Sequence, residues 1–533
     1  MKTSVTFLIC SGIAGVLFPI GNLQAAAANT GNADRNIKKA MIKQETCNMA
    51  EPINRKKTCT PESLGISSTA LIKLIDAWNT YEHVHSFIIK RNGRTAAEGF
   101  WKPYDLDTPH MLFSLSKSFI SCAVGFAIEE KRFSLDTLIL DIFPEYKKAV
   151  TDERFNRMTI RHLLTMSTGH NNCALRYFNR QTDPIDFKRD FFASPLRFEP
   201  GTRFVYNSAA TYILSAAVRK VTGENPSVYL RKRLLDPLGI GERYWEKSPD
   251  GTDCGGWGYC LTTREISSFA EMLRNGGRIN GRQVIPADYF ASAVSKLADT
   301  SKNDAPDWKL GYGFQFWRTR HNAFRADGSF GQYAIVMPDL DMTIAITSGG
   351  SDMPGILDIL WDNLLPGVSD KPLPENPQAY AELQQKIAKL SLPVLKGKAP
   401  ESTHKITASF TGAPGGITGL EITVSPENCR LDFRRKDRPQ TAITAGWGQP
   451  VRSTTEIEDD HPDPVSATAE ISSGTLKVRV YNCGAPFYSD YTFTLKDGVL
   501  SLDRQRNLVY RDRNWKIFSG KAVSDISSFA EIR

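Results

Sequence analysis

The segment at residues 115–131 places the strongest constraint on how this chain can fold. It has helical periodicity and apolar side chains on nearly every side, including Phe119, Ile120, Val124, Phe126 and Ile128. A helix that is apolar all round is stable only when other elements surround it, so we expect it in the middle of a domain. Hydrophobic residues make up 41% of the chain, which is ordinary for a globular protein with such a core.

The sequence Ser114-Leu115-Ser116-Lys117 stands at the start of this helix. If Ser114 begins the helix, its hydroxyl lies at the positive end of the helix dipole, and Lys117 falls on the same face one turn later. A lysine in a partly desolvated site loses proton affinity, and its neutral amine can accept the serine proton. The motif therefore predicts an activated nucleophile. The alternative is a helix-capping serine beside an exposed lysine, and the same spacing recurs at Ser402 and Lys405, where a strand is expected.

Two further segments carry groups that such a nucleophile needs. Tyr206 lies on a predicted loop before an apolar helix and can supply a phenol that exchanges protons with the lysine, although a lone tyrosine is more often a packing residue. Downstream, Ala326-Asp327-Gly328-Ser329 leads into a predicted strand. A backbone N–H at that strand edge can complete an oxyanion hole with the N–H of Ser114.

The order and spacing of these elements resemble those of the serine β-lactamase and penicillin-binding-protein superfamily. The surrounding sequence is similar to the class C β-lactamase-related serine hydrolases, in particular to 6-aminohexanoate-dimer hydrolases and related esterases. The resemblance covers roughly residues 70–365, and it rests on Phe113-Ser-Leu-Ser-Lys-Ser-Phe119, Thr159-Ile-Arg-His-Leu-Leu-Thr-Met-Ser-Thr-Gly169, Pro200-Gly-Thr to Tyr206-Asn-Ser, Tyr312-Gly-Phe-Gln-Phe-Trp317 and Phe330-Gly-Gln-Tyr333.

The resemblance implies an α/β (α+β) fold, with an antiparallel sheet flanked by helices and a helical subdomain. It also implies that Ser114 is the acylated nucleophile, Lys117 its base and Tyr206 the second proton-transfer group. The N–H groups of Ser114 and Ser329 would form the oxyanion hole. No cofactor is implied.

The chain departs from the β-lactamase pattern at two positions. The third residue of Tyr-x-Asn is Ser208, so the amide that would contact a β-lactam is replaced or shifted to Asn207. The Lys-Thr-Gly element is Ala326-Asp327-Gly328, which lacks a cation, and Asp327 would repel carboxylates. Esters or small amides therefore fit better than β-lactams. A β-lactamase or D-amino-acid peptidase, and a catalytically silent envelope-binding protein with the same fold, are the alternatives.

Other candidate residues have weaker support. By the resemblance, His170 lies on a loop that borders the site. We expect it to have a structural role, and contact with substrate is the alternative. Trp257, Tyr259 and Tyr312 either line an apolar acyl pocket or pack in the core. Gly328 is a small residue at the predicted strand edge, where it would let substrate approach the backbone. The eight histidines are scattered without a ligand motif, so no metal site is expected.

Composition along the chain predicts five parts. Residues 1–28 have the basic start, apolar stretch and alanine run of a cleavable signal peptide, and residues 29–46 have the composition of a flexible tether. Residues 47–366 would form the hydrolase domain, followed by a Pro-rich linker with a short helix at 367–400. Residues 401–533 carry β-branched runs broken by turns and predict a C-terminal antiparallel β domain.

Turn and strand patterns add local predictions. Asn92-Gly93 predicts a hairpin over residues 87–99, and residues 311–317, 333–337 and 342–347 predict strands.

The signal peptide expected at residues 1–28 predicts a periplasmic or secreted protein that has no stable membrane span after cleavage. An oxidising compartment permits disulfides, and proximity suggests Cys47–Cys59, Cys254–Cys260 and Cys429–Cys483. Cys122 lies in the apolar helix and is expected to be a buried thiol.

The net charge of +8 is scattered, without the Lys/Arg-rich run that follows a phosphate backbone, so nucleic acid is not expected as a partner. The expected ligand is a small-molecule ester or amide. For the C-terminal domain three roles stay open, namely covering the active-site mouth, contacting the cell envelope, and stabilising the first domain.

Overall fold

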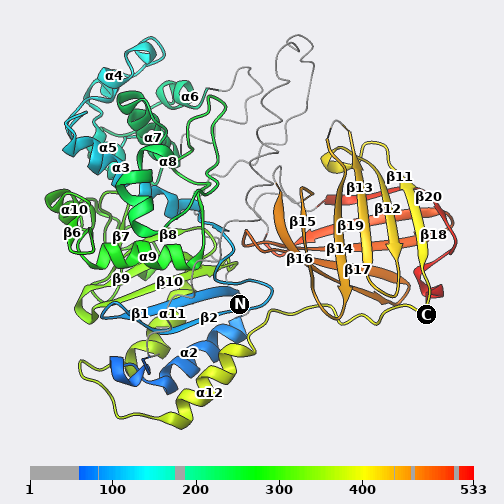
Figure 1. Ribbon diagram of the computed structural model, residues 1–533. Coiled ribbons are helices and arrows are strands. Elements are labelled where there is room, and N and C mark those ends of the chain that lie inside the picture. The colour runs from blue at the N-terminus through cyan, green and yellow to red at the C-terminus, as the bar shows by residue number, and fades with distance from the viewer. Residues whose placement is uncertain are drawn as a thin grey trace.

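The computed structural model describes residues 59–81, 83–173, 186–436, 438–457, 462–508 and 515–532 (Figure 1). The predicted signal peptide, the predicted tether and Cys47 lie outside the described residues. Figure 1 shows an N-terminal domain of helices around a sheet, with a second domain made almost wholly of strands beside it.

The N-terminal domain is built on a six-stranded antiparallel sheet in the order β2-β1-β10-β9-β8-β7. Its strands are β1 (Val84–Arg91), β2 (Arg94–Phe100), β7 (Trp317–Arg318), β8 (Phe324–Gly328), β9 (Gln332–Met337) and β10 (Met342–Ser348). The predicted hairpin is confirmed. Asn92 and Gly93 have φ of 52° and 72°, the left-handed pair that a two-residue hairpin turn requires.

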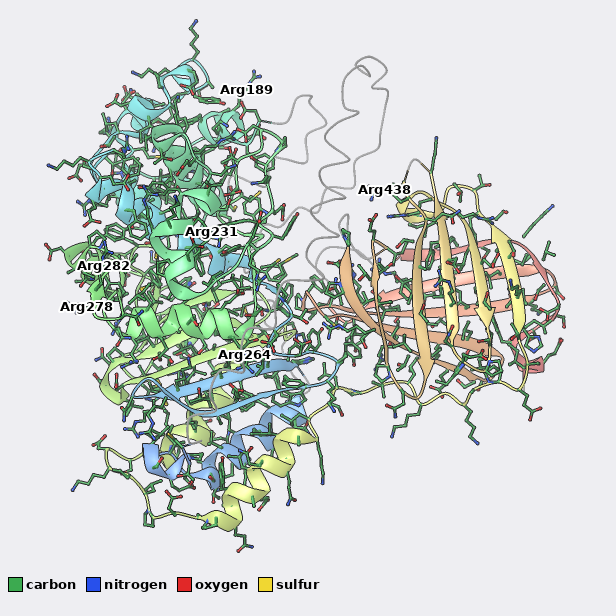
Figure 2. The ribbon with its side chains drawn as sticks, viewed as in Figure 1. Arg189, Arg231, Arg264, Arg278, Arg282 and Arg438 are labelled. Atoms are coloured by element: carbon green, nitrogen blue, oxygen red, sulfur yellow. The ribbon has the colours of Figure 1, made fainter. Side chains whose placement is uncertain are left out.

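Helices cover both faces of this sheet (Figure 1). On one face lie α2 (Ser68–Tyr81), α11 (Met353–Leu364) and α12 (Pro377–Ala388), and α9 (Thr263–Arg274) packs on the other against β9 and β10. Arg264, labelled in Figure 2, reaches from α9 to the sheet edge, where it pairs with Glu98 of β2 and with Asp107. The predicted α+β layering is therefore confirmed.

The apolar helix α3 (Ser116–Glu129) lies between the sheet and a helical subdomain, and its residues 116–127 are all buried. The subdomain contains α4 (Ile139–Ile142), α5 (Ile160–Leu164), α6 (Phe187–Ala193), α7 (Ser208–Thr222) and α8 (Pro226–Tyr229), with α10 (Ala287–Ala293) nearby. The predicted central position of this helix is confirmed, but Ser114 does not begin it. Ser114 lies in the preceding 3-10 turn η3 (Phe113–Leu115).

Short strand pairs complete the N-terminal domain. β3 (His110–Met111) pairs with β4 (Cys260–Leu261), and β5 (Arg278–Ile279) pairs with β6 (Arg282–Gln283). Within the described residues, no helix has the length and apolar character needed to cross a lipid bilayer.

The C-terminal domain is a ten-stranded sheet that closes on itself. Its order is β14-β13-β12-β11-β20-β19-β18-β17-β16-β15, and a parallel pairing of β14 with β16, the neighbour of the last strand β15, closes the sheet. The strands are β11 (His404–Ser409), β12 (Ile417–Val424), β13 (Cys429–Arg435), β14 (Thr441–Trp447), β15 (Val451–Thr455), β16 (Asp463–Ser472), β17 (Thr475–Asn482), β18 (Tyr488–Lys496), β19 (Val499–Arg506) and β20 (Trp515–Ser524). Closure removes the exposed edges that an open sheet would leave.

Most of the segment predicted as a linker packs on the N-terminal domain. Helix α12 contacts α2 and β2, and Leu383, Leu390 and Leu392 are buried in the same core as Trp78. The Leu392 N–H also donates to the Lys102 carbonyl at 2.8 Å. The chain therefore leaves this domain only after Leu392, a short distance before β11.

Residues 311–317 do not form the predicted strand. Only Trp317 belongs to β7, and Gln315 has φ of 65°. The Gln315 side chain donates to the carbonyl of Leu164 at 2.8 Å, and a Cβ at Gly313 would lie 2.0 Å from the Ala293 carbonyl oxygen. This segment is a buried loop in close contact with its neighbours, because its glycines allow an approach that a regular strand does not.

Two of the suggested disulfides are wrong. Cys254, Cys429 and Cys483 are free thiols in the structure. Cys122 is a buried free thiol, as predicted. Cys429 packs inside the C-terminal sheet, whereas Cys483 lies at the domain junction, where its Sγ is 3.7 Å from the Pro103 carbonyl oxygen. The suggested partner of Cys59, Cys47, lies outside the described residues.

Two histidines form a buried pair close to the domain junction. His85 Nδ1 lies 3.3 Å from His110 Nε2, and the His85 ring stacks on Tyr104 with centroids 3.6 Å apart. Burial lowers the pKa of His110 to about 4 and lowers the pKa of His85 well below its usual value. Both imidazoles are therefore neutral in the folded protein at neutral pH.

We predict that lowering the pH from about 8 to about 5 destabilises the fold by about 2 kcal/mol through His110, and that His85 adds a loss in the same direction. The unfolded chain binds protons at these groups below about pH 6.5 while the folded chain does not, so stability is lost as the pH falls. Urea unfolding of the wild type and of His110→Gln at both pH values measures this. An equal pH dependence in the two proteins would contradict the prediction.

Candidate active site

The structure brings Ser114 and Lys117 into contact. The Lys117 Nζ lies 3.0 Å from Ser114 Oγ, 3.0 Å from Ser208 Oγ and 2.6 Å from the Gly256 carbonyl oxygen. The one-turn separation produces the first contact, because η3 continues directly into α3. Gly256 allows the third, since a Cβ there would lie 2.7 Å from the Ser208 carbonyl oxygen.

Burial changes the acid–base character of Lys117. Its side chain is only 1% exposed, and its three hydrogen-bond partners are uncharged. Desolvation lowers the pKa of Lys117 to about 7, although the negative charge of Asp327 acts in the opposite direction. A substantial fraction of the amine is therefore neutral near pH 7, as a general base requires.

Tyr206 lies beside this pair. Lys117 Nζ is 5.0 Å from the centroid of the Tyr206 ring, and the ring stacks on Trp317 with centroids 5.9 Å apart. Burial raises the pKa of Tyr206 above its usual value, and a hydrogen bond with Ser114 only partly offsets this. The phenol therefore stays protonated at neutral pH and can donate a proton.

The two residues after Tyr206 have different places. Asn207 caps α7, where its Oδ1 accepts a hydrogen bond from the Ala209 N–H at 3.0 Å, and its side chain is fully buried. Ser208 is the first residue of α7 and contacts Lys117. The structure thus places Asn207 in the scaffold and Ser208 beside the lysine.

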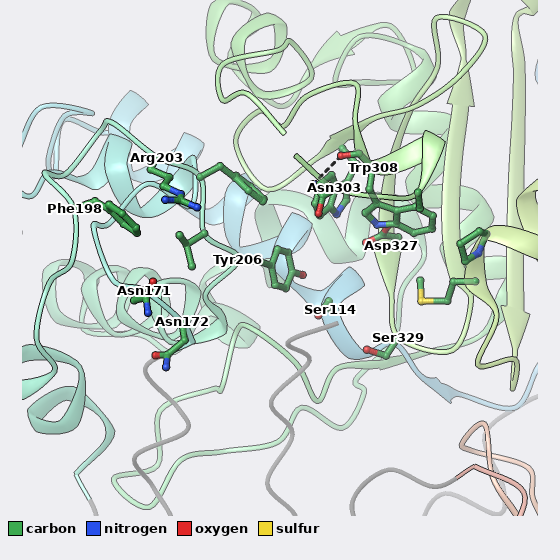
Figure 3. Close-up of a pocket in the computed structure, with 16 residues that line it drawn as sticks. Ser114, Asn171, Asn172, Phe198, Arg203, Tyr206, Asn303, Trp308, Asp327 and Ser329 are labelled. Carbon is green, nitrogen blue, oxygen red and sulfur yellow. Dashed lines mark hydrogen bonds between the residues drawn. The ribbon is translucent and has the colours of Figure 1, made fainter. Parts of the chain in front are cut away.

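Strand β8 brings Ser329 close to Ser114. At Gly328 a Cβ would lie 1.9 Å from the Leu112 carbonyl oxygen, so only glycine allows β8 to approach η3 this closely. The chain then turns, with the Gly331 N–H donating to the Gly328 carbonyl at 3.2 Å. Ser114 and Ser329 both line one cavity, which is the arrangement expected for a pair of oxyanion donors (Figure 3).

Asp327 does not present an unpaired charge. Arg325, on the same side of β8, lies 2.9 Å from its carboxylate and is completely buried. The Arg325 guanidinium also stacks over Trp308 at 4.3 Å and donates to the Asp307 carbonyl at 2.8 Å. The expectation that Asp327 repels carboxylates is therefore corrected, since Arg325 compensates its charge from within the domain. Burial nevertheless raises the pKa of Asp327. The element Ala326-Asp327-Gly328 itself carries no cation, as expected.

The cavity has a volume of about 410 Å³. Aromatic and apolar side chains form much of its wall, and Asn171, Asn172, Asn303 and Arg203 add polar groups (Figure 3). The Asn303 Nδ2 donates to the Trp308 carbonyl at 3.0 Å, which fixes one side of the wall. The cavity is thus suited to an apolar group carried next to a reactive carbonyl.

The aromatic residues of this wall are not the ones suggested by the sequence. Trp257, Tyr259 and Tyr312 are buried in the core and do not line the cavity. Phe198, Phe204, Trp308 and Trp317 line it instead. Side-chain direction in these irregular segments depends on tertiary contacts, so no periodicity in the sequence distinguishes the two groups.

His170 does not line the cavity, although Asn171 and Asn172, which follow it on the same loop, do. Its Nδ1 is 2.9 Å from Thr168 Oγ1, its Nε2 is 3.3 Å from the Phe191 carbonyl oxygen, and burial lowers its pKa to about 4. These contacts give it a structural place within the helical subdomain.

Arg203 is a cavity residue that the sequence did not indicate. Its guanidinium lies 4.4 Å above the Phe198 ring at the cavity wall. It belongs to the segment between Pro200 and Tyr206 that carries the resemblance, but a single arginine on a loop gives no signal by itself. Among the described residues, no group of three or more His, Cys, Asp or Glu side chains could hold a metal ion.

A model of the beta-lactamase family matches residues 84–364, more than half of the chain. The chain belongs to the beta-lactamase family. The match covers the sheet, α3 and the helical subdomain, and ends before the C-terminal domain.

Relatives of this beta-lactamase family member include esterases and an amidase. The chain is 26% identical over 329 residues to a 6-aminohexanoate-dimer hydrolase of Paenarthrobacter ureafaciens, covering 56% of this chain and 82% of that protein. It is 27% identical over 168 residues to a lovastatin esterase of Penicillium rubens, covering 28% of this chain and 42% of that protein. The chain therefore matches less than half of the length of the lovastatin esterase.

Among solved structures, the chain is similar to a putative 6-aminohexanoate-dimer hydrolase from Bacillus anthracis, with a TM-score of 0.44 and 19% identity over 62% of this chain and 85% of that one. It is also similar to a putative beta-lactamase from Bacteroides dorei, with a TM-score of 0.47 and 16% identity over 56% of this chain and 99% of that one.

We predict that Arg325→Met lowers the free energy of unfolding by about 3–5 kcal/mol, because it leaves the buried Asp327 carboxylate without its cation. Urea unfolding at about pH 8 measures the change. The double variant Arg325→Met/Asp327→Asn removes both charges and should regain part of the loss. A single variant within about 1 kcal/mol of the wild type would contradict the ion-pair interpretation.

Proposed function

We propose that this protein is an exported serine hydrolase that cleaves esters or small amides through a covalent acyl intermediate on Ser114. The contact of Ser114 Oγ with the buried Lys117 Nζ at 3.0 Å carries the proposal. Membership of the beta-lactamase family, and relatives named as esterases and as a 6-aminohexanoate-dimer hydrolase, support the same chemistry. The composition of residues 1–28 supports export.

In the first half of the reaction, the neutral Lys117 amine accepts the Ser114 hydroxyl proton while Oγ attacks the substrate carbonyl carbon. The carbonyl oxygen becomes negatively charged and accepts hydrogen bonds from the N–H groups of Ser114 and Ser329. When the carbonyl re-forms, the bond to the alcohol or amine breaks. The leaving group takes a proton from the Tyr206 phenol, which regains one from Lys117.

In the second half, a water molecule attacks the acyl-Ser114 carbonyl carbon. The neutral Lys117 amine removes a proton from this water, and Ser114 Oγ leaves and takes that proton back from Lys117. The products are a carboxylic acid and the free enzyme. Because Lys117 has uncharged hydrogen-bond partners, it can accept and return a proton in each half of the cycle.

The walls of the cavity support a preference for substrates with an apolar acyl or alkyl group. Phe204, Trp308 and Trp317 can pack against such a group next to Ser114. Ala326 stands where the β-lactamase pattern has a free lysine, and the neighbouring Arg325 is paired with Asp327. β-Lactams therefore lose their usual carboxylate anchor at this strand.

We predict that Ser114→Ala loses fluorophosphonate labelling, measured by intact mass, and turns over p-nitrophenyl esters at least about 1,000-fold more slowly than the wild type. Ser402→Ala is the matched control, because Ser402 has the same spacing to a lysine, Lys405, but lies on the C-terminal domain. It should label and react as the wild type does.

Labelling that survives in Ser114→Ala would exclude Ser114 as the nucleophile. A folded wild type that neither labels nor turns over esters would instead favour the silent binding protein. Nitrocefin in the same panel tests the β-lactamase alternative, which rapid turnover would favour.

We predict that kcat/KM for an ester rises with pH, passes through an inflection at about pH 7 and then levels off. Lys117 must be neutral to accept the serine proton, and its pKa is about 7, so activity is lost as the pH falls below that value. Initial rates across the range measure the profile, and Lys117→Arg should be inactive throughout because guanidinium stays protonated. A profile without this inflection would contradict the assignment of the base.

A further inference from the structure

The residues beside Ser114 and Ser329 share an unusual backbone conformation. Phe113, directly before Ser114, has φ of 50°, and Phe330, directly after Ser329, has φ of 68°. Bulky side chains rarely adopt this left-handed region, and it persists only where surrounding contacts determine it. Two such residues next to the two proposed oxyanion donors indicate a constraint on the backbone at this place.

Phe330 has this conformation within a tight turn. The Gly331 N–H donates to the Gly328 carbonyl at 3.2 Å, so Ser329 and Phe330 are the two central residues of the turn. A positive φ at the second central position normally favours glycine. The turn that presents Ser329 therefore depends on what keeps Phe330 in place.

A side chain from the C-terminal domain packs on both phenylalanines. Phe487 lies in the connection between β17 and β18, and its ring centroid is 6.3 Å from that of Phe113 and 5.6 Å from that of Phe330. Phe113 and Phe330 are themselves 5.2 Å apart. All three pairs are edge-to-face, which is a favourable arrangement of aromatic rings. Ala485 and Leu508 complete this apolar cluster.

Backbone contacts fix the connection that carries Phe487. The Met111 N–H donates to the Gly484 carbonyl at 2.8 Å, and the Tyr104 hydroxyl donates to the Ala485 carbonyl at 3.1 Å. A Cβ at Gly349, at the end of β10, would lie 2.5 Å from the Pro486 carbonyl oxygen. The connection is therefore docked closely against the N-terminal domain immediately before Phe487.

An ion pair anchors the same junction on another side. Arg452 of β15 lies 2.7 Å from the Asp105 carboxylate and also contacts Thr108. The C-terminal domain thus meets the segment leading to Ser114 at several separate points.

We propose that Phe487 is a positioning residue for the hydrolase site. It keeps Phe113 and Phe330 in their left-handed conformations, and these set the directions of the peptide that carries the Ser114 N–H and of the turn that carries Ser329. This inference rests on the proposed function and extends it, because it makes the C-terminal domain part of the active site. Phe487 does not line the cavity and packs on Phe113 and Phe330, so it acts through the backbone.

The expected effect follows from that role. Without the Phe487 ring the N–H groups of Ser114 and Ser329 are no longer held in position. They then stabilise the oxyanion formed during the reaction less well. We expect Phe487→Ala to lower kcat about 10- to 100-fold while KM changes less than about threefold and the inflection near pH 7 stays in place. Phe487→Leu, which keeps much of the apolar volume, should retain more of the activity.

The experiment compares ester turnover by the full chain with Phe487→Ala, Phe487→Leu and the matched control Phe410→Ala. Phe410 is 7% exposed and Phe487 is 9% exposed. Phe410 also makes an edge-to-face contact, with Phe518 at 5.0 Å, but it lies in the C-terminal sheet away from the site. The control should keep wild-type kcat even where its thermal midpoint falls.

Wild-type kcat in Phe487→Ala, or an equal loss of kcat in Phe410→Ala, overturns the proposal. If Phe487→Ala does not fold, Phe487→Leu decides, because an unchanged kcat in that folded variant together with an unchanged hydrogen-exchange rate in the 328–331 turn contradicts the role. Ser114→Ala is measured in parallel. Activity retained there refutes the proposed function, whereas an inactive Ser114→Ala with a fully active Phe487→Ala refutes only the positioning role.

Discussion

The site depends on the placement of one amine in a buried environment where its hydrogen-bond partners are uncharged. Lys117 contacts two hydroxyls and a carbonyl, and no carboxylate is among its hydrogen-bond partners. Desolvation therefore lowers its pKa without a salt bridge to restore it. The close packing of α3, α7 and the loop at Gly256 keeps water away from the Lys117 amine, because a water-filled gap at any of these contacts would solvate the ammonium. The all-round apolar character of α3 is thus a condition for the chemistry as well as for the core.

The resemblance to the serine β-lactamase superfamily predicted the fold of the first domain and the meeting of Ser114, Lys117 and Tyr206. The periodicity of α3, the Asn92-Gly93 turn and the spacing within Ser114–Lys117 are local signals, and local geometry turns them into contacts. The place of Ser208 could be anticipated only in part. A hydroxyl in the third position of the Tyr-x-Asn element suggested a missing substrate amide, and the structure shows instead an acceptor for Lys117.

What the sequence could not predict depends on contacts between distant segments. Asp327 looked like an isolated negative charge until the fold placed Arg325 on the same side of β8 and stacked it on Trp308. The suggested Cys429–Cys483 pair failed for the same reason, since one thiol packs inside a sheet and the other at a domain junction. Neither distance in sequence nor compartment determines which side chains meet across a closed sheet.

The two domains are coupled through backbone strain. A non-glycine residue in the left-handed region costs of order 1–3 kcal/mol, and an edge-to-face aromatic pair contributes about 0.5–1.5 kcal/mol beyond its buried area. The contacts of Phe487 with Phe113 and Phe330 are therefore of the right size to offset much of the strain at both positions. A domain that only added stability would have no reason to place its aromatic side chain beside the two strained residues that flank Ser114 and Ser329. The closed sheet gives the β17–β18 connection a rigid support, and this connection in turn holds the backbone beside Ser114 and Ser329 in position.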